Sequence, residues 1–593
     1  MIRPLPTPTD NPGGPPWEVE ASPTEAVVPA ETTQVEKEKD ILEYFPLPSP
    51  RASQKVVIKA IDDHFKAGKR VVILEGPVGS GKSAVAVTFA RYQAAHPSKI
   101  PLEEGKLPPA PCHILTPRKS LQDQYFEDFP ADVVTMKGRG AYPCIFDTEP
   151  KYYYPILKAI EAGKSAPVAF GEPTCSEGPC KDSREIWKSC TQEHECPYTV
   201  AVGIAQSNAT VVHNLHSFLY QTNFSDKFEK RSLMIIDEAH EIESTIRDFA
   251  TRKVYVNSVI TDADVAGLKG VKDWVEFLLT PKYVPETTER DAALKAQDES
   301  YKSKREEYQE RVAALELKAS TYEKGFSVEI NPHVKPGTNI QTGTTLELVP
   351  HYVGGEVNRL LLDHGEKILL MSGTIYDKGQ FCQALGIPDS ECAFIRVGSS
   401  FPKENRPVYL MPKYQTNTSH AKWDQNFDEI VGIIQNILAI FHDAKGLIHA
   451  PSYYAAYQLE RALASDRVIT HEAGDFLTKL ASFFSSKGNG VFISPVCQQG
   501  VDFKEDRARF QIVLRVPYPN TSSQFVKDKL ANHYAWYNYQ ALVVLGQQLG
   551  RVNRSESDFG ATFLIDERFN SFISKNKKYL PKWVTDAVIY QTK

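Results

Sequence analysis

The chain has 593 residues, of which 41% are hydrophobic and 24% are charged, and its formal net charge is -6. These values are ordinary for a soluble globular protein, and the length predicts several domains. They exclude a strongly basic protein, so any nucleic-acid surface must be a local groove. No apolar run is long enough to span a bilayer and no secretory segment opens the chain, so we expect no membrane partner.

Nine cysteines in a chain of this length do not indicate a disulfide scaffold. We therefore expect a reducing compartment, which is the cytoplasm of a bacterium or of a virus-infected cell, or the nucleus if the source is eukaryotic. Thiols that cluster in such a compartment point to metal binding.

The first 43 residues are rich in Pro, Thr and Glu, and they predict a disordered tail. Folded sequence starts near Tyr44 and Phe45. Arg51 and Gln54 then head a predicted helix that runs through Val57, Ile58, Ile61 and Phe65. The amide of Gln54 can pair with an adenine edge, and Phe45 could stack on the ring. The alternative is a surface glutamine on an amphipathic helix.

Residues 76–83 read GPVGSGKS, between the apolar run 71–74 and an Ala/Val-rich helical segment. A strand, a glycine-rich turn and a helix start form a phosphate cradle, because the backbone N–H groups curl around the β-phosphate. Lys82 reaches the β/γ-phosphates and the Ser83 hydroxyl can ligate Mg²⁺. The predicted nucleotide contacts are Gln54, Gly76, Gly79, Ser80, Gly81, Lys82, Ser83 and Asp237.

Two basic turns follow the phosphate loop. The strand at residues 113–116 ends in Thr116, Pro117 and Arg118, and the strand at 133–136 leads into KGRG, which includes Arg139. Hydroxyl, cation and backbone N–H donors at the carboxyl end of a strand suit a sugar-phosphate backbone. The alternative is a pair of solvated loops.

Five cysteines fall within about fifty residues of polar, loop-like sequence, and four thiolates can hold zinc or an iron–sulfur cluster. No C-x-x-C pair occurs, so the usual zinc-ribbon spacing is missing. Spacing alone does not decide which four of the five bind. The candidate metal ligands are Cys144, Cys175, Cys180, Cys190 and Cys196.

The apolar run 233–236 ends in Asp237 and Glu238. We expect a buried strand that carries these carboxylates to the sheet edge where the phosphate loop lies. Asp237 is placed to hold Mg²⁺, and Glu238 to orient and deprotonate the attacking water. The alternative is a helix start with two capping acids.

Residues from about 250 to 345 read as an insertion. Between Glu289 and Lys324 the chain is dense in Ala, Glu, Lys and Arg, with Leu and Tyr at helical spacing. We expect a long solvated helix or a helical hairpin there.

A second α/β unit follows, with strands predicted at residues 408–411, 446–449, 468–471, 491–494, 511–516 and 561–565. It contains no second phosphate loop. Near its end, Gln547 precedes Arg551 and Arg554, two arginines that lie on one helical face. Such a pair can approach a γ-phosphate from the opposite domain as arginine fingers, and a surface pair is the alternative.

In order, GPVGSGKS, ILTPRKSLQDQ, KGRGAYPC, CPY, DEAH, MSGT, GLIHAPSYY, QQGVDF, RFQIVLRVPYP and QQLGRVNR closely resemble a superfamily 2 helicase of the XPD–DinG type. The resemblance covers the chain from about residue 44 to its end, except the insertion after the DEAH box. It implies an α/β fold with two RecA-like parallel-sheet motor domains, an inserted cysteine-rich iron–sulfur domain and a short helical arch-like insertion.

The implied domains follow from the motif positions. Residues 44–140, 205–249 and 346–395 form the first RecA-like domain, 141–204 the iron–sulfur domain, 250–345 the arch-like insertion and 396–593 the second RecA-like domain.

The resemblance further implies a monomeric motor that uses ATP, Mg²⁺ and a [4Fe–4S] cluster. It would move 5′→3′ on single-stranded DNA, open forked duplexes and serve DNA repair or replication. Gly500 and Asp502 would couple the ATP state to the grip on DNA. The catalytic set is Lys82, Asp237, Glu238, Gln547, Arg551 and Arg554, and the candidates for the DNA path are Thr116, Arg118, Arg139, Thr374 and Ser452. Cys144 and Cys196 match the first and last cluster ligands.

Three alternative functions would account for parts of this set of motifs. A DNA translocase that displaces bound proteins would carry identical motifs. An RNA-directed DEAH ATPase would use the cysteines for structural zinc. A P-loop kinase leaves the second α/β unit and the arginine pair unexplained.

Overall fold

The computed structural model describes residues 39–77, 79–96, 111–146, 150–161, 173–181, 188, 190, 196–225, 227–297, 301–316, 319–335, 338–497, 503, 505–553 and 558–590. The chain divides into two compact units, Met1–Asp40 and Ile41–Lys593, and the account below concerns the second. Most of the predicted tail lies outside the described residues. The first element described is the 3₁₀ helix η1 (Ile41–Tyr44), which packs against the first two α-helices just before the predicted boundary.

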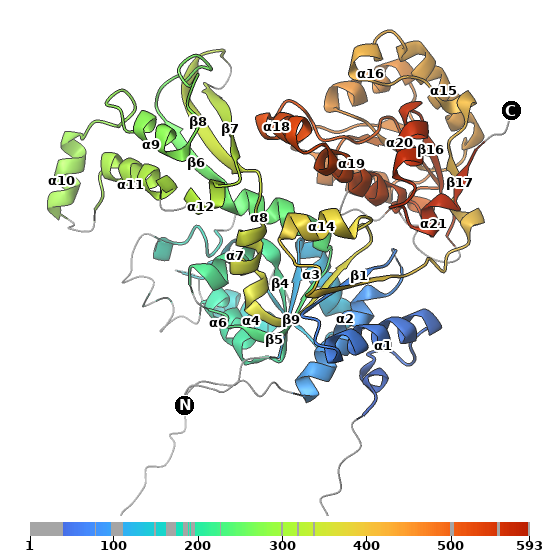
Figure 1. Ribbon diagram of the computed structural model, residues 1–593, viewed down its shortest axis with the longest axis horizontal. Helices are drawn as coiled ribbons and strands as arrows, with labels where there is room; N and C mark the ends of the chain where they lie inside the picture. The colour runs from blue at the N-terminus through green and yellow to red at the C-terminus, as the bar shows by residue number, and fades with distance from the viewer. Residues whose placement is uncertain are drawn as a thin grey trace, which may run out of the picture. The chain divides into compact units, whose positions relative to one another are not determined.

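The first domain is built on a seven-stranded parallel sheet (Figure 1). Its strands, in spatial order, are β10 (Cys392–Arg396), β1 (Val71–Glu75), β9 (Gly365–Ser372), β5 (Arg231–Ile236), β2 (Cys112–Thr116), β4 (Thr210–Asn214) and β3 (Val134–Met136). Strand β9 lies between β1 and β5. The phosphate loop, the MSGT turn and the DEAH box therefore leave the sheet side by side at one edge.

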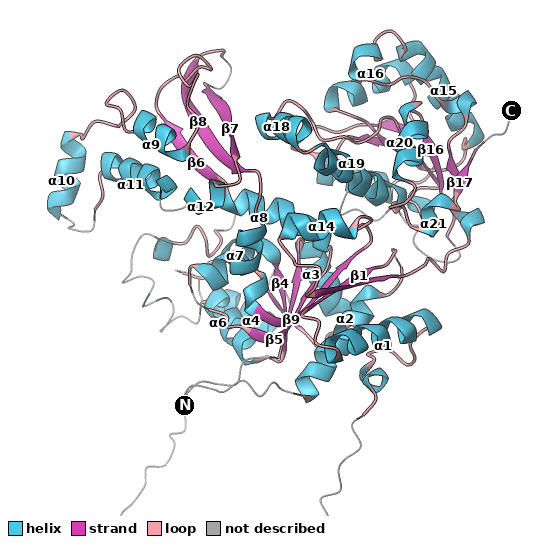
Figure 2. Ribbon diagram, viewed as in Figure 1, coloured by secondary structure: helices cyan, strands magenta, loops and turns pink. Residues whose placement is uncertain are grey.

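Helices cover both faces of this sheet, as Figure 2 shows. Val72 and Leu74 of β1 point to one core cluster, and Val71 and Ile73 point to the other, with the period of two that a strand requires. The first cluster receives α1 (Ala52–Lys66), α2 (Lys82–Ala95) and α3 (Lys119–Asp128). The second receives α7 (Leu215–Asn223), α8 (Ile242–Ala250), α13 (Gly354–Leu360) and α14 (Lys378–Leu385).

A second seven-stranded parallel sheet forms the other α/β domain. Its strands are β13 (Val468–Ile469), β14 (Val491–Ser494), β12 (Gly446–His449), β15 (Phe510–Val513), β16 (Ala561–Leu564), β11 (Val408–Tyr409) and β17 (Val588–Ile589). Its helices are α15 (Phe427–Ile440), α16 (Tyr453–Leu463), α17 (Phe476–Ser485), α18 (Gln524–Asn532), α19 (Tyr534–Leu549), α20 (Arg568–Asn576) and α21 (Lys582–Thr585). The six predicted strands are confirmed, and two parallel-sheet α/β domains are present.

The helices expected between Glu289 and Lys324 are present, but the insertion also contains a sheet that was not predicted from the sequence. Helices are present, as α9 (Val271–Leu278), α10 (Glu289–Gln297), α11 (Lys304–Glu316) and α12 (Ala319–Tyr322). They accompany an antiparallel sheet of β6 (Arg252–Val256), β8 (Gln341–Pro350) and β7 (Phe326–Val334), in that order. Val254, Leu346 and Leu348 alternate with exposed or half-buried neighbours and pack on Trp274 and Tyr308. Because this alternation buries one apolar face of each segment, the segments form strands of an antiparallel sheet.

The cysteine-rich segment packs beside β3 and β4. Its described elements are η2 (Arg139–Ala141), α4 (Pro150–Glu161), η3 (Pro179–Lys181) and α6 (Pro197–Ser207). Helices α4 and α6 contact each other, and Met136 and Val211 of the sheet join the same apolar cluster as the cysteines. Among the described residues, no helix is both long and apolar enough to cross a membrane.

Lys529 of α18 is buried, with 7% of its surface exposed, and its ammonium donates to the carbonyl of His351 at 3.0 Å. Burial lowers the pKa of Lys529 to about 8, although the nearby Glu243 carboxylate raises it. Between pH 8 and the ordinary value of 10.5, the unfolded chain holds a proton that the folded chain lacks. Burying the charged Lys529 ammonium therefore lowers the free energy of unfolding by its full amount below pH 8, and this destabilisation decreases as pH rises.

We therefore expect the wild type to gain stability relative to Lys529→Met between about pH 7 and about pH 10. Urea unfolding followed by tryptophan fluorescence measures the difference. Lys527→Met, at an exposed position of the same helix, is the control and should show no such change. An equal wild-type-minus-Lys529→Met difference at both pH values would contradict the shifted pKa.

Candidate functional site

The phosphate loop bends through two glycines in the left-handed region, with φ of 76° at Gly79 and 79° at Gly81. Side chains disfavour this conformation, which explains glycine at both positions. Gly81 is also the residue before helix α2, so the free N–H groups of the helix start face the loop. The local geometry is that of an anion cradle.

Gln54 lies against this loop. It is 4% exposed, and its amide nitrogen donates to the carbonyl of Gly81 at 3.5 Å. Its amide oxygen accepts from the backbone of Arg51, whose guanidinium in turn donates to the carbonyl of Gly79 at 2.9 Å. The structure therefore gives Gln54 a contact with the loop backbone. Phe45 is buried in the core, so the stacking role considered for it is wrong in this conformation.

The residues predicted to hold phosphate and Mg²⁺ lie together at the edge of the first sheet. The Lys82 ammonium donates to the carbonyls of Gly76 at 2.9 Å and Pro77 at 3.3 Å. The hydroxyl of Tyr125 bonds both to Ser83 and to a carboxylate oxygen of Asp237, the latter at 3.2 Å. A hydroxyl and a carboxylate that converge in this way are suitable ligands for Mg²⁺.

Asp237 and Glu238 have different environments. Burial, and then the neighbouring Glu238 carboxylate, raise the pKa of Asp237 to about 6, against the lowering effect of Lys82. Glu238 adopts φ of 51°, an uncommon conformation for a non-glycine residue. His240 lies within 3.4 Å of Glu238 and pairs with the Ser372 hydroxyl at 2.9 Å.

Two hydrogen bonds continue this network into the second domain. The backbone N–H of Thr374 donates to the Ser372 hydroxyl at 3.1 Å, and the Gln547 amide donates to the Thr374 hydroxyl at 2.8 Å. Arg551 donates to both the carbonyl and the amide oxygen of Gln547, each at 3.1 Å. Residues of α19 therefore meet residues of the first sheet edge.

One narrow cavity, of about 40 Å³, collects these groups. Its lining includes Lys82 and Glu238 from the first domain and Gln547 and Arg551 from the second. Binding sites for ligands of nucleotide size enclose roughly 300–1,000 Å³, so the walls must separate before a nucleotide can enter. Arg554, Gly500 and Asp502 lie outside the described residues.

The five candidates for the DNA path have different surroundings. Thr116 is fully buried, with its hydroxyl on the carbonyl of Arg118, and Thr374 is 3% exposed in the nucleotide site. Neither hydroxyl therefore faces solvent. Arg118 pairs with Glu241 at 3.1 Å, and Arg139 donates to the sulfur of Cys180 at 3.2 Å. Ser452 is exposed and caps α16 through the N–H of Ala455.

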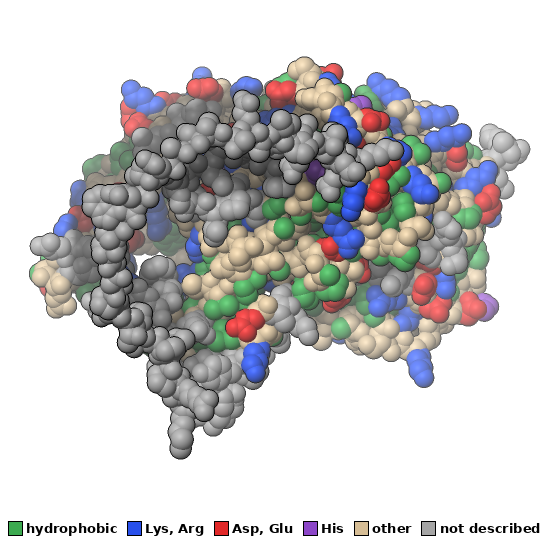
Figure 3. All heavy atoms as spheres, turned by 90° about the horizontal axis from the view of Figure 1, so that it is seen from below, with side chains coloured by type: hydrophobic (Ala, Val, Ile, Leu, Met, Phe, Trp, Pro, Cys, Tyr) green, Lys and Arg blue, Asp and Glu red, His purple; other side chains and the backbone are tan. Residues whose placement is uncertain are grey.

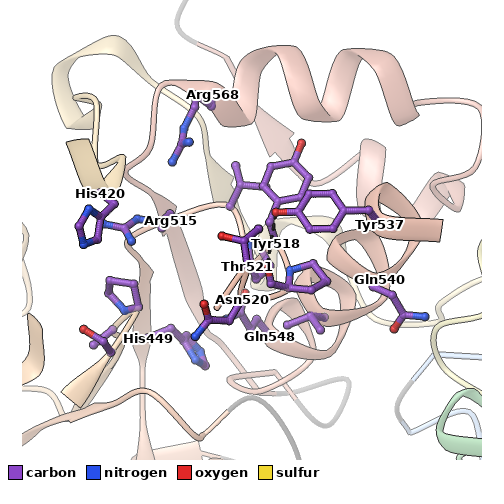
Figure 4. Close-up of a pocket in the computed structure, with 17 residues that line it drawn as sticks. His420, His449, Arg515, Tyr518, Asn520, Thr521, Tyr537, Gln540, Gln548 and Arg568 are labelled. Carbon is purple, nitrogen blue, oxygen red and sulfur yellow. Dashed lines mark hydrogen bonds between the residues drawn. The ribbon is translucent and has the colours of Figure 1, made fainter. Parts of the chain in front are cut away.

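A second cavity, of about 730 Å³, opens beside Ser452 in the second domain. Figure 4 shows Arg515 and His420 on one side of it and Tyr518 and Tyr537 on the other. The two tyrosine rings stack with centroids 5.1 Å apart. Cations and stacked aromatic rings are the side chains that bind single-stranded nucleic acid. Arg515 and Tyr518 lie in the RVPYP sequence, so this motif could have indicated the cavity. No sequence pattern indicated that Tyr537 would join them.

Basic and acidic side chains of the described residues are interspersed on the face shown in Figure 3. This mixture agrees with the net charge of -6, and it makes a nucleic-acid surface a local feature.

Four cysteines of the candidate metal set, Cys175, Cys180, Cys190 and Cys196, are buried in one apolar cluster, and Cys144 is half-buried beside them. The sulfurs of Cys175 and Cys196 are 3.8 Å apart. A Cβ added to Gly178 would lie 2.7 Å from the sulfur of Cys144 and 3.8 Å from that of Cys180, so this glycine leaves room for both.

The surroundings of Cys196 favour the ionised form of its thiol. A hydrogen bond from Cys175 and backbone N–H groups at the start of α6 lower the pKa of Cys196 to about 5, although burial raises it. The donors are therefore reduced thiols, one of them favoured as a thiolate, which fits a metal or an iron–sulfur cluster. Among the described residues, no three ligating side chains converge into a formed metal site.

Two family models match the chain. The Type III restriction enzyme, res subunit model matches residues 47–261, and the Helicase C-terminal domain model matches residues 434–587. The first match contains the phosphate loop and the DEAH box, and the second contains Gln547 and Arg551.

Curated relatives match parts of the chain. Fanconi anemia group J protein homolog of Gallus gallus is 32% identical over 18% of this chain and 10% of its own length. Regulator of telomere elongation helicase 1 of Bos taurus is 30% identical over 40% of this chain and 22% of its own. ATP-dependent DNA helicase CHL1 of Kluyveromyces lactis is 18% identical over 39% of this chain and 33% of its own length. The chain thus spans no more than a third of these relatives.

The fold matches more fully. A solved structure of an XPD helicase superposes with a TM-score of 0.55 at 14% identity, over 92% of this chain and 100% of the other. This similarity concerns the fold, with its two parallel-sheet domains.

Proposed function

Because this chain belongs to the XPD-like family of superfamily 2 helicases, we propose that it is an ATP-dependent DNA helicase that moves 5′→3′ on single-stranded DNA. The observation that carries the proposal is the single cavity where Lys82 and Glu238 meet Gln547 and Arg551. A motor needs this arrangement, because hydrolysis must be sensed by two domains that can move apart. Its substrates are single-stranded and forked DNA, and it works as a monomer.

In the proposed reaction, Lys82 and the loop N–H groups hold the β- and γ-phosphates, while Ser83 and Asp237 hold Mg²⁺. Glu238 orients the attacking water and accepts its proton. Arg551 and Arg554 stabilise the charge that develops on the γ-phosphate, and Gln547 holds Arg551 through the two bonds described above. Mg²⁺ supplies charge neutralisation when it is bound.

ATP binding draws the two domains together and hydrolysis releases them. Each domain holds a separate part of the DNA backbone, so alternating grips move the strand. Arg118 and Arg139 serve the first domain, and Ser452 serves the second. The Arg515 and Tyr518 cavity beside Ser452 offers further contacts.

The cysteine-rich segment is proposed to hold a [4Fe–4S] cluster on four of its five cysteines. The support is chemical, since none of these thiols is in a disulfide and four of them are buried in one cluster with Cys144 beside them. The cluster would staple a rigid module, which acts as a wedge where the duplex divides.

Replacing Cys196 with Ser should remove the brown absorbance and abolish strand displacement, because the module loses its staple. ATP hydrolysis stimulated by single-stranded DNA should remain within about threefold of wild type, because the phosphate site does not use this module. Iron content, absorbance and both activities are measured on anaerobically purified protein. Cys382→Ser, at a buried thiol outside the module, is the matched control. Normal unwinding by Cys196→Ser protein would overturn the wedge.

The function itself is tested with tailed duplexes. ATP-dependent displacement from a 5′-tailed duplex, and none from a 3′-tailed duplex, is the expected result. Displacement only from the 3′ tail would refute the proposed direction. Removal of a bound protein without strand separation would indicate a translocase, and RNA-stimulated ATPase with zinc in place of iron would indicate an RNA-directed enzyme.

A further inference from the structure

Helix α19 connects the nucleotide site to a second contact between the domains. Gln547 lies near its carboxyl end, and Trp536 lies near its start, about three helical turns away. Trp536 contacts helix α8, which begins shortly after the DEAH box of the first domain. The two ends of α19, a helix of the second domain, therefore contact the first domain at two places, the nucleotide site and helix α8.

The contact at the Trp536 end centres on Glu243, which is 7% exposed. The indole N–H of Trp536 donates to both carboxylate oxygens, at 3.0 and 3.1 Å. The amide of Gln540, one turn further along α19, donates to the same carboxylate at 3.2 Å. One side chain of the first domain thus holds two successive turns of α19.

Arg247 completes the charge balance. Its guanidinium donates to Glu243 and, at 3.2 Å, to the carbonyl of Pro350. It also lies over the rings of Phe525, at 4.6 Å, and Trp536, at 5.8 Å. The charge-assisted bonds to Glu243, and the ring faces of Phe525 and Trp536 against Arg247, fix the direction of the contact as well as its strength.

Packing prevents α19 from sliding along the first domain. A Cβ on Gly546 would lie 1.9 Å from the Tyr376 hydroxyl, so the helix backbone passes directly over that ring. Tyr539 and Val543 of α19 belong to the core cluster of the first domain. The helix therefore has a defined position, which the Glu243 contact and the Gln547–Thr374 bond secure at opposite ends.

We propose that Glu243 is a positioning residue for ATP hydrolysis, which acts through Trp536 and Gln540 on α19 to place Arg551 at the γ-phosphate. The inference rests on the proposed ATPase activity. A buried ion pair contributes little net stability compared with apolar residues of the same size, and its directed bonds instead specify one arrangement. Here that arrangement is the one in which Gln547 and Arg551 face Lys82 and Glu238.

The mildest test is Trp536→Phe, because it removes the indole N–H and keeps both the ring and the Glu243–Arg247 pair. We expect kcat for DNA-stimulated ATP hydrolysis to fall about fivefold, since a displaced arginine weakens only the transition state. KM for ATP should stay within about twofold, because Lys82 and the loop are untouched. Trp274→Phe, a buried tryptophan of the insertion, is the matched control.

Glu243→Gln removes the charge and should lower kcat about tenfold with the same unchanged KM. Asp248→Asn makes the same charge change at an exposed position of α8 and should have no effect. Thermal unfolding of each variant checks that the loss of activity does not come from loss of the fold.

The decisive measurement combines each change with Arg551→Lys. If Glu243 acts through Arg551, then Trp536→Phe and Glu243→Gln should change kcat by less than about twofold in the Arg551→Lys protein. Effects that multiply as in wild type would overturn the proposal. An inactive wild type would instead refute the ATPase itself, while an active wild type with fully active Trp536→Phe and Glu243→Gln proteins would refute only this inference.

Discussion

Replacing Glu238 with Gln should reduce ATP hydrolysis about 10²- to 10⁴-fold and leave ATP binding nearly unchanged, because the substitution removes only the proton acceptor. Glu238 lines the cavity with Lys82, whereas the Asp237 carboxylate is buried and accepts a hydrogen bond from Tyr125. The two acids can then serve different purposes, Mg²⁺ binding at Asp237 and proton acceptance at Glu238.

Single-turnover hydrolysis and the binding of a fluorescent ATP analogue measure the two effects of Glu238→Gln separately. Glu391→Gln, a half-exposed carboxylate of the first domain, is the control and should behave as wild type. A Glu238→Gln protein that binds ATP weakly but hydrolyses it at the normal rate would place Glu238 outside the reaction.

Replacing Arg551 with Ala should lower the hydrolysis rate about 10³-fold or more, because an arginine finger acts on charge that exists only in the transition state. Arg551 is 6% exposed and is held by two bonds to Gln547, so its guanidinium is already oriented before ATP arrives. Arg551→Lys keeps the charge and loses the planar fork, and it should recover only part of the rate.

Binding of single-stranded DNA should be unchanged in Arg551→Ala protein, since Arg551 lies in the nucleotide cavity. Arg311→Ala, at an exposed arginine of α11, is the control. If Arg551→Ala instead weakened DNA binding and spared hydrolysis, the arginine would belong to the DNA path.

Much of the nucleotide site was predictable from the sequence, because short runs of neighbouring residues encode its strands and its loop. An apolar run that ends in glycine or acidic residues predicted β1 and β5, and the glycine spacing predicted the cradle before Lys82. These features depend on neighbours within ten residues, where backbone preference and burial agree.

The insertion could not be predicted in this way. Arg252 of β6 pairs with Leu348 of β8, almost a hundred residues away, and no local pattern records a pairing over such a separation. The helical composition between them, which α10 and α11 confirm, concealed the sheet. Gln54 and Phe45 show the same limit, because their partners in the loop and the core decide what they contact.

The sequence by itself determined the two parallel sheets, the phosphate cradle and the order of the motifs, because each is encoded in a short run of residues. Only the tertiary structure decided that α19 is held at both ends. Glu243 and Trp536 are 293 residues apart, and Thr374 and Gln547 are 173 apart. Their hydrogen bonds exist because two separate domains pack together, and no local pattern of residue types records such a contact.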